Sequence, residues 1–242
     1  VRAKKTRGRS PYIILYAHGG GYTSGGLNYA RILAAKMAIS TGYDVISFEY
    51  RLAPENKYPA QLNDAMDVWD RIVSRGYSPR EVLIAGDSAG GNLALCLTQR
   101  LIRQRVSPRA LILFSPWANM EAASATYDMY DGLDPILSRT FVERCAEAYM
   151  PEGADSSSPE YSPLHGSFRR FPPTLIQVGR TEILLDDSVK LHSRIVSAGG
   201  RATLDIEDDG WHVYQQMPVS IASRAMKRVG DFVDEVTASK KR

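Results

Sequence analysis

The stretch GDSAGGN, residues 86–92, decides the fold, because it places a serine between glycines at the join of two different patterns. It follows a short apolar run, Val82–Ala85, and leads into a segment with helical periodicity, Asn92–Arg103. A glycine-rich turn from a strand into a helix has two common purposes: it cradles a phosphate group, or it presents a nucleophile. The rest of the sequence decides between these purposes.

Six strand-length runs of apolar, β-branched or aromatic residues are spread along the chain. They are Tyr12–Tyr16, Asp44–Phe48, Val82–Ala85, Ala110–Phe114, Thr174–Val178 and Ala202–Ile206. Segments with helical periodicity lie between most of them and after the last: Tyr29–Ser40, Ala60–Ser74, Asn92–Arg103, Asp186–Ala198 and Ile221–Val236. Strands that alternate with helices predict an α/β fold with a mostly parallel central sheet and helices on both faces.

The interval 118–171 interrupts this alternation, since it holds no strand pattern and one helical segment, Arg139–Tyr149. We interpret it as a lid-like insertion over the carboxyl edge of the sheet, within a single domain that spans residues 1–242. Four aromatic residues in or beside it either line a substrate pocket or pack the lid itself: Trp117, Tyr127, Tyr130 and Tyr161.

The net charge of the 242-residue chain is +3, and its positive excess lies at the two ends. Residues 1–9 hold five basic side chains and residues 240–242 hold three more, with no acidic residue in either stretch. Removing these eight positive charges leaves −5 for the rest of the chain. Because neither end has interleaved aromatic residues or an apolar helical face, we expect solvated ends and no nucleic-acid partner.

The two cysteines, Cys96 and Cys145, fit no metal-binding spacing, so we expect reduced thiols and a cytoplasmic location. No apolar run approaches the roughly 18 residues that span a bilayer, which predicts a soluble chain. The sequence starts without methionine and without a signal-peptide apolar core, so it is expected to begin inside a longer chain.

Phosphate binding is disfavoured, because no lysine follows the glycines of residues 86–92 and no glycine fingerprint opens the first strand–helix unit. Gly86-Asp87-Ser88-Ala89-Gly90 instead matches G-x-S-x-G in the required context of strand, sharp turn and helix. The glycines remove side chains that would collide in such a turn, and the serine then projects from the carboxyl edge of the sheet. Ser88 is therefore the predicted nucleophile.

A serine hydroxyl needs a base, and on this topology the acid and then the histidine come later in the chain. His212 follows the last strand in a loop before the final helix, whereas His165 lies in the lid-like segment and His192 lies inside a helix. His212 is the predicted base. The remaining histidine, His18, is expected to anchor its own loop.

The acid is expected directly after the fifth strand, in a loop that offers three carboxylates. Glu182 lies nearest the strand, whereas Asp186 and Asp187 begin the next helix, where acidic residues are common as N-terminal caps. We favour Glu182 and keep Asp186 as the alternative.

The sequence HGGGY, residues 18–22, follows the first strand and predicts donors for an oxyanion. A run of glycines lets the backbone turn its N–H groups toward a ligand, and HGGG is the form that lipases and esterases use. The expected donors are the amides of Gly20, Gly21 and Ala89.

Three early motifs together resemble the hormone-sensitive-lipase-like branch of the α/β-hydrolases, a group that includes bacterial esterases. They are HGGG at 18–21, YRLAPE at 50–55 and GDSAGGN at 86–92, and SPW at 115–117 is a further match. The resemblance covers nearly the whole chain. It implies an α/β-hydrolase fold and hydrolysis of short- to medium-chain carboxylic esters, with a serine–acid–histidine triad and neither metal nor cofactor.

Position by position, the resemblance implies Ser88 as nucleophile, Glu182 as acid, His212 as base, and the Gly20, Gly21 and Ala89 amides as the oxyanion hole. Glu182 stands where many relatives have aspartate, which is a compatible exchange. YRLAPE is interpreted as a scaffold motif, with two X–Pro bonds, Ala53–Pro54 and Tyr58–Pro59, where a cis peptide can occur.

The main hypothesis is a serine carboxylesterase that works through an acyl-enzyme. An amidase or arylformamidase would use the same residues, and a non-catalytic relative such as the plant gibberellin receptors would lack the histidine that is present here as His212. The resemblance leaves a monomer and a homodimer open. Relatives carry an amino-terminal cap and further leading strands, whereas 17 residues precede His18 here. That segment is expected to be removed or unseen, or this is a naturally minimal form.

Overall fold

The computed structural model describes residues 1–3 and 10–238, in which six parallel strands form one sheet. The strand order is β2-β1-β3-β4-β5-β6. The strands are β1 (Ile13–Ala17), β2 (Asp44–Ser47), β3 (Val82–Asp87), β4 (Leu111–Phe114), β5 (Thr174–Gly179) and β6 (Ala202–Glu207). All six predicted strands are confirmed, with small shifts at their ends, and the mostly parallel sheet expected from the sequence is parallel throughout the described residues.

Five long helices connect or follow these strands as predicted. They are α1 (Leu27–Thr41), α2 (Ala60–Ser74), α3 (Ala89–Arg103), α6 (Leu185–Ser197) and α7 (Ser220–Thr237). Helix α3 begins three residues earlier than the pattern predicted, directly after Ser88. Gly90 and Gly91 are poor helix formers, but both are buried in the packed turn, so the tertiary context overrides their propensity.

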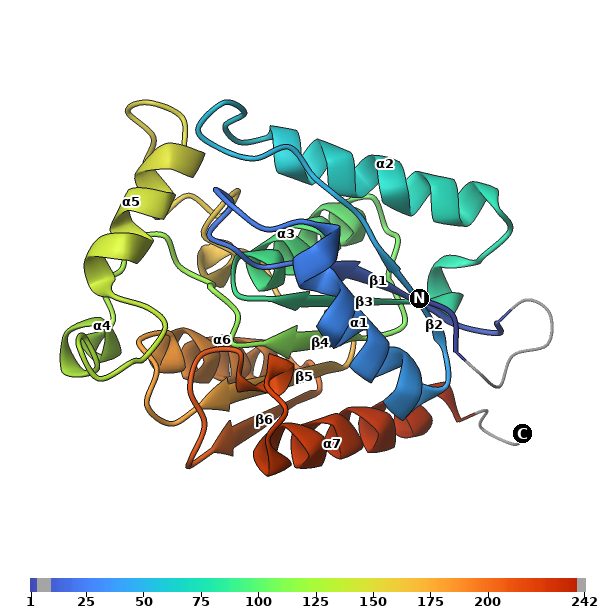
Figure 1. Cartoon of the computed structure of the whole chain (residues 1–242). Helices are drawn as coiled ribbons and strands as arrows, with labels where there is room; N and C mark the ends of the chain where they lie inside the picture. The colour runs from blue at the N-terminus through green and yellow to red at the C-terminus, as the bar shows by residue number, and fades with distance from the viewer. Residues whose placement is uncertain (4–9, 239–242) are drawn as a thin grey trace.

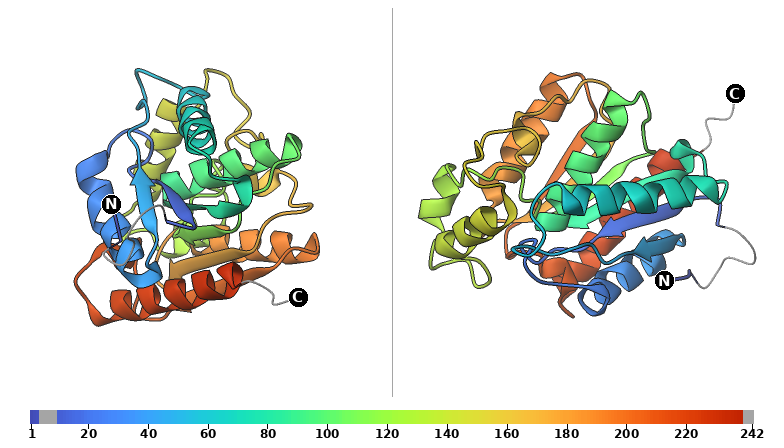
Figure 2. Two further views of the ribbon diagram at one scale, coloured as in Figure 1. Left: turned by 90° about the vertical axis from the view of Figure 1, so that its right-hand side faces the viewer. Right: turned by 90° about the horizontal axis from the view of Figure 1, so that it is seen from above.

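The helices cover the two faces of the sheet and bury a separate core on each (Figures 1 and 2). Alternate residues of β1 divide between these cores: Ile13 and Leu15 pack with α2, α3 and α6, and Ile14 and Tyr16 pack with α1 and α7. All five residues of β1 are buried, which explains its continuous apolar sequence. The α/β fold with helices on both faces is thereby confirmed.

The register of the strands brings their carboxyl ends to one edge of the sheet. Ala17 pairs with Gly86, Asp87 with Phe114, and Gly179 with Glu207. The loops that follow these strands therefore start side by side. Ligands of open α/β sheets bind at this edge, because the loops there are free to converge.

Residues 118–171 contain no strand, as predicted, and hold the expected helix α5 (Arg139–Tyr149) together with a short α4 (Ala125–Met129) that the sequence did not reveal. Both helices lie beyond the carboxyl ends of the strands (Figure 1). The five residues of α4 are too few to show a helical period in the sequence. The Thr126 hydroxyl of this helix donates to the carbonyl oxygen of Ile183, in the loop before α6, at 2.8 Å.

Most of the predicted solvated basic ends, including Lys4, Lys5 and the last three residues, lie outside the described residues. Within 1–3 and 10–238, none of the helices is both long and apolar enough to cross a bilayer.

Candidate active site

The turn between β3 and α3 presents Ser88 with φ 54° and ψ −123°, a backbone conformation that non-glycine residues rarely adopt. A Cβ atom added to Gly86 would lie 2.1 Å from the carbonyl oxygen of Gly90, and one added to Gly90 would lie 2.2 Å from that of Ala17. The glycines on both sides of the serine are therefore required by contact, as the sequence predicted. The Ser88 N–H donates to the carbonyl oxygen of Phe114 at 2.9 Å, which holds the turn against β4.

The HGGG loop follows β1 and lies beside this turn. Gly20 and Gly21 have φ of +112° and +62°, the left-handed region that glycine accepts without steric cost. Among the described residues, no hydrogen bond uses the N–H of either glycine. Ala89 is the first residue of α3, so its N–H also lacks a partner within the helix. Three amides at this edge of the sheet are thus available to an external acceptor.

His18 contacts its own loop and the YRLAPE motif. Its imidazole stacks on Tyr50 at a centroid distance of 4.3 Å, and its Nδ1 lies 2.8 Å from the carbonyl oxygen of Gly19. The Tyr50 hydroxyl donates to the His18 carbonyl oxygen at 2.7 Å. Burial lowers the pKa of His18, which favours a neutral ring. Both X–Pro bonds of this region, Ala53–Pro54 and Tyr58–Pro59, are cis.

Glu182 and His212 come together from the loops after β5 and β6. Nδ1 of His212 lies 3.4 Å from Oε1 of Glu182, and both side chains are buried. The other carboxylate oxygen of Glu182 accepts from the Gly179 N–H and from the Ser115 hydroxyl, each at 2.9 Å. The Ser115 hydroxyl in turn accepts the Val213 N–H at 3.1 Å. Ser115, from the SPW motif, therefore ties the acid to the residue after His212.

The competing acidic residues contact other groups. Asp186 lies 4.0 Å from the Lys190 ammonium, and Asp187 accepts the N–H groups of Ala118 and Asn119 at 2.9 Å each. Burial raises the pKa of Asp187 to about 7, against the two backbone donors that favour its charged form. Of the three carboxylates that the sequence offered, Glu182 is the one in hydrogen-bonding distance of His212.

The other two candidate histidines lie elsewhere in the described structure. His165 pairs with Glu121, with Nε2 and Oε2 2.8 Å apart. His192 is half-buried in helix α6.

Four of the predicted site residues line one cavity of about 200 Å³. Ser88, His212, Gly20 and Gly21 all line it. Within the described residues the His212 ring bonds Glu182 and not the Ser88 hydroxyl, and catalytic hydrogen bonds are often long or absent in unliganded sites. The remaining wall is largely apolar: Trp117, Ile136, Leu137, Phe141, Val142 and Leu184. The cavity therefore suits an uncharged, apolar group beside a serine and an imidazole.

Of the four aromatic residues considered for the pocket, only Trp117 lines this cavity. Tyr127 is fully buried, and Tyr161 packs edge-on against Tyr58 at 5.4 Å. Tyr130 packs against the same core from a partly buried position. These three tyrosines therefore pack in the apolar core between 118–171 and the sheet, which is the packing alternative that the sequence left open.

Asp87, the residue directly before Ser88, has contacts at the site that the sequence did not predict. Its carboxylate is fully buried and accepts hydrogen bonds from Tyr16, Gly19 and Tyr29. Burial raises its pKa. An aspartate at the end of an otherwise apolar strand was a visible signal, whereas its partners lie about 60 to 70 residues away in sequence and could not be identified from spacing.

The described residues contain no group of three or more His, Cys, Asp or Glu side chains arranged to hold a metal ion.

Comparisons with known proteins identify the family of this chain. Residues 14–216 match the family model described as alpha/beta hydrolase fold. An esterase from Acinetobacter venetianus is 32% identical over 231 residues, which cover 94% of this chain and 76% of that protein.

Two solved structures are similar over almost the whole chain. The esterase EstE5, soaked with p-nitrophenyl butyrate, is 34% identical, covers 98% of this chain and 80% of its own, and has a TM-score of 0.93. An esterase from the bacterial hormone-sensitive lipase family is 33% identical, with 95% and 78% covered and a TM-score of 0.91. The chain therefore belongs to the α/β-hydrolase family and is a carboxylesterase of its bacterial hormone-sensitive-lipase branch.

Proposed function

We propose that this carboxylesterase hydrolyses short- to medium-chain esters through an acyl-enzyme on Ser88. His212 is the general base, Glu182 orients and stabilises its imidazolium, and the amides of Gly20, Gly21 and Ala89 form the oxyanion hole. The observation that carries this proposal is that Ser88, His212, Gly20 and Gly21 line one cavity, while Oε1 of Glu182 lies 3.4 Å from Nδ1 of His212.

In the first step Oγ of Ser88 attacks the ester carbonyl carbon, and Nε2 of His212 takes the hydroxyl proton. The carbonyl oxygen becomes an oxyanion, which the backbone amides stabilise; one such donor contributes roughly 3–4 kcal/mol. When the tetrahedral intermediate collapses, the carbon–oxygen bond to the alcohol breaks and the alcohol takes the proton from His212. Water then repeats the sequence on acyl-Ser88 and releases the carboxylic acid.

The apolar wall and the cavity of about 200 Å³ support substrates with a short, uncharged acyl or alcohol group. The soak of EstE5 with p-nitrophenyl butyrate points to the same substrate class for that relative. We further propose that residues 118–171 act as a lid-like insertion of a single domain. Ile136, Leu137 and Val142 of this segment line the cavity and would separate a bound acyl group from water.

We infer a reducing, cytoplasmic location from the two cysteines. Cys96 and Cys145 are both buried as free thiols rather than joined in a disulfide. We propose no nucleic-acid partner and a monomer or a homodimer as the working form.

The test is hydrolysis of p-nitrophenyl esters from acetate to dodecanoate, with the matching anilide beside the best ester. We expect a maximum at short to medium chains, a much slower anilide, and a kcat lowered by roughly 10⁴–10⁶ in Ser88→Ala and in His212→Ala. His192→Ala is the matched control and should retain wild-type activity. Turnover that survives Ser88→Ala, or a faster anilide than ester, contradicts the proposal.

A further inference from the structure

The carboxylate of Asp87 connects three parts of the molecule that converge beside Ser88. Oδ1 accepts the Tyr16 hydroxyl of β1 at 2.6 Å and the Gly19 N–H of the HGGG loop at 3.0 Å. Oδ2 accepts the Tyr29 hydroxyl of α1 at 2.6 Å. Because Asp87 is fully buried, all of these donors come from the protein itself.

The contact between this carboxylate and the HGGG loop leaves almost no free space. A Cβ atom added to Gly19 would lie 2.4 Å from Oδ2 of Asp87 and 3.1 Å from Cβ of Ser88. The loop backbone thus rests directly on the carboxylate. A rotation or shift of the carboxylate must move Gly19, and the amides of Gly20 and Gly21 follow it in the chain.

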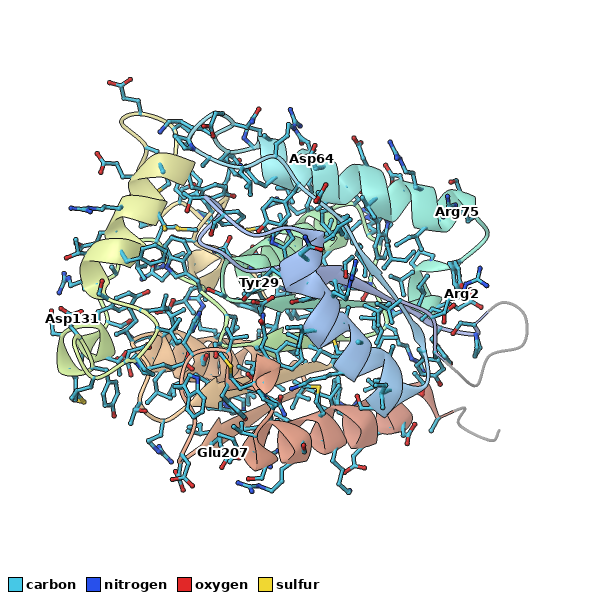
Figure 3. The ribbon with its side chains drawn as sticks, in the orientation of Figure 1. Arg2, Tyr29, Asp64, Arg75, Asp131 and Glu207 are labelled. Atoms are coloured by element: carbon cyan, nitrogen blue, oxygen red, sulfur yellow. The ribbon has the colours of Figure 1, made fainter. Side chains whose placement is uncertain are left out.

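Tyr29 differs from Tyr16 in where its ring lies. Tyr16 is fully buried between the sheet and the helices, whereas Tyr29 is partly exposed and lines the cavity together with Ser88 and His212. It lies at the amino-terminal turn of α1 (Figure 3). Tyr29 therefore reaches both the substrate cavity and the buried support of the HGGG loop.

We propose that Tyr29 is a positioning residue of the esterase reaction, acting through Asp87 on the backbone amides that would bind the oxyanion. This inference rests on the proposed function. Without the Tyr29 hydroxyl, Oδ2 of Asp87 loses its donor in a buried place, so the carboxylate must rotate, take up a proton or admit water. Each response displaces Gly19, and with it the amides of Gly20 and Gly21 that would bind the oxyanion.

We expect the substitution of Tyr29 to weaken stabilisation of the transition state and to leave substrate binding almost unchanged. The oxyanion forms only as the ester carbonyl is attacked, so its donors contribute to kcat and scarcely to ground-state binding. In Tyr29→Phe, which keeps the ring in the cavity, we expect kcat on p-nitrophenyl butyrate to fall about 10-fold, with KM within about 2-fold. Affinity for a trifluoromethyl ketone, which forms a tetrahedral oxyanion on Ser88, should fall by the same factor as kcat/KM.

Tyr43→Phe is the matched control, because its hydroxyl bonds Thr237 at 3.3 Å and its ring does not line the cavity. It should change neither kcat nor the ketone affinity. A double-mutant cycle with Asp87→Asn tests the route of the effect. If Tyr29 acts through Asp87, then Tyr29→Phe in the Asp87→Asn protein should add less than about a 2-fold loss. If Asp87→Asn does not fold, the ketone comparison on Tyr29→Phe decides alone.

Three outcomes overturn the inference. A raised KM with unchanged kcat makes Tyr29 a substrate contact, and an unchanged kcat and ketone affinity remove its role altogether. Both results leave Ser88-dependent turnover, and with it the proposed function, in place. A wild-type protein without Ser88-dependent turnover instead removes the proposed function and this inference with it.

Discussion

The loops at the carboxyl edge of the sheet and the segment 118–171 line the same cavity, but the loops contribute mainly through their backbone and the segment through its side chains. At the edge, backbone conformation places the reactive groups, since Gly20, Gly21 and Ser88 all have positive φ. In the segment, side chains on α5 and the preceding loop form the wall, and Ile136 and Phe141 remain 51% and 46% exposed. The edge therefore determines the chemistry, and the segment determines the shape of what fits.

This division has a physical basis in how each region is supported. Strand ends in a parallel sheet are fixed by hydrogen bonds on both sides, so the first residues of a loop that follows such a strand have a fixed position. Residues 118–171 have no strand, and their position depends on apolar packing and on a few polar contacts such as that of Asp187 with Ala118 and Asn119. Changes at the edge should therefore alter kcat, and changes in the segment should alter chain-length preference or stability.

After Ser88→Ala and His212→Ala, the largest effect is expected for Glu182→Ala at the edge. It removes the partner of His212 and leaves the Ser115 hydroxyl and the Gly179 N–H without their buried acceptor. We expect kcat for p-nitrophenyl butyrate to fall by about 10³–10⁴. Asp186→Ala, four residues along the chain, is the control and should stay within about 2-fold. A reversal of these two results would assign the acid to Asp186.

The junction of the two regions offers a pH-dependent prediction. The pKa of Asp187 is raised by burial to about 7, whereas an aspartate in the unfolded chain ionises near 3.9. Between these values the folded protein binds the extra proton, so the Asp187 contribution to the free energy of unfolding is fully present below about pH 4. It is lost as pH rises toward and through 7, by up to about 1.4 kcal/mol per unit.

Urea unfolding of wild type and Asp187→Asn at pH 5 and pH 8 measures this contribution. The free energy of unfolding of the wild type should fall between the two pH values by about 1–3 kcal/mol more than that of Asp187→Asn. Asp186→Asn should keep the wild-type dependence. Parallel pH dependence in wild type and Asp187→Asn would exclude a raised pKa at this site.

The smallest effect is expected for Phe141→Ala in the segment. The truncation widens the mouth of the cavity without touching the strand-end loops. We expect KM for p-nitrophenyl butyrate to rise about 3- to 10-fold, kcat to stay within about 3-fold, and the preferred acyl chain to lengthen. Met129→Ala, exposed on α4 and outside the cavity lining, is the control. A loss of kcat equal to that of Glu182→Ala would erase the distinction between the two regions.

Several features of the site could be predicted from the sequence because they depend on neighbours in the chain. G-x-S-x-G after an apolar run indicates the turn, since only glycine tolerates the 2.1–2.2 Å approaches found at Gly86 and Gly90. The order of serine, acid and histidine follows from the order of the strands, and it brought Ser88, Glu182 and His212 to one edge. The chemical roles of these residues stay predictions until the variants are measured.

Other features could not be predicted, because they depend on packing between distant segments. Trp117 lines the cavity whereas Tyr127 of α4 is buried in the core, and the periodicity of so short a helix does not distinguish these two positions. The partners of Asp87 come from β1, the HGGG loop and α1, and spacing cannot relate them.

Local patterns alone thus determined the α/β fold, the strand-to-helix turn with its serine and the glycine loop, because hydrophobic period and steric limits act over a few residues. Tertiary structure alone decided that Glu182 rather than Asp186 reaches His212, that α5 forms a wall of the cavity, and that Tyr29 supports Asp87. The physical reason is that hydrogen-bond geometry and close packing depend on distances set by the whole sheet, which no single segment of the sequence contains.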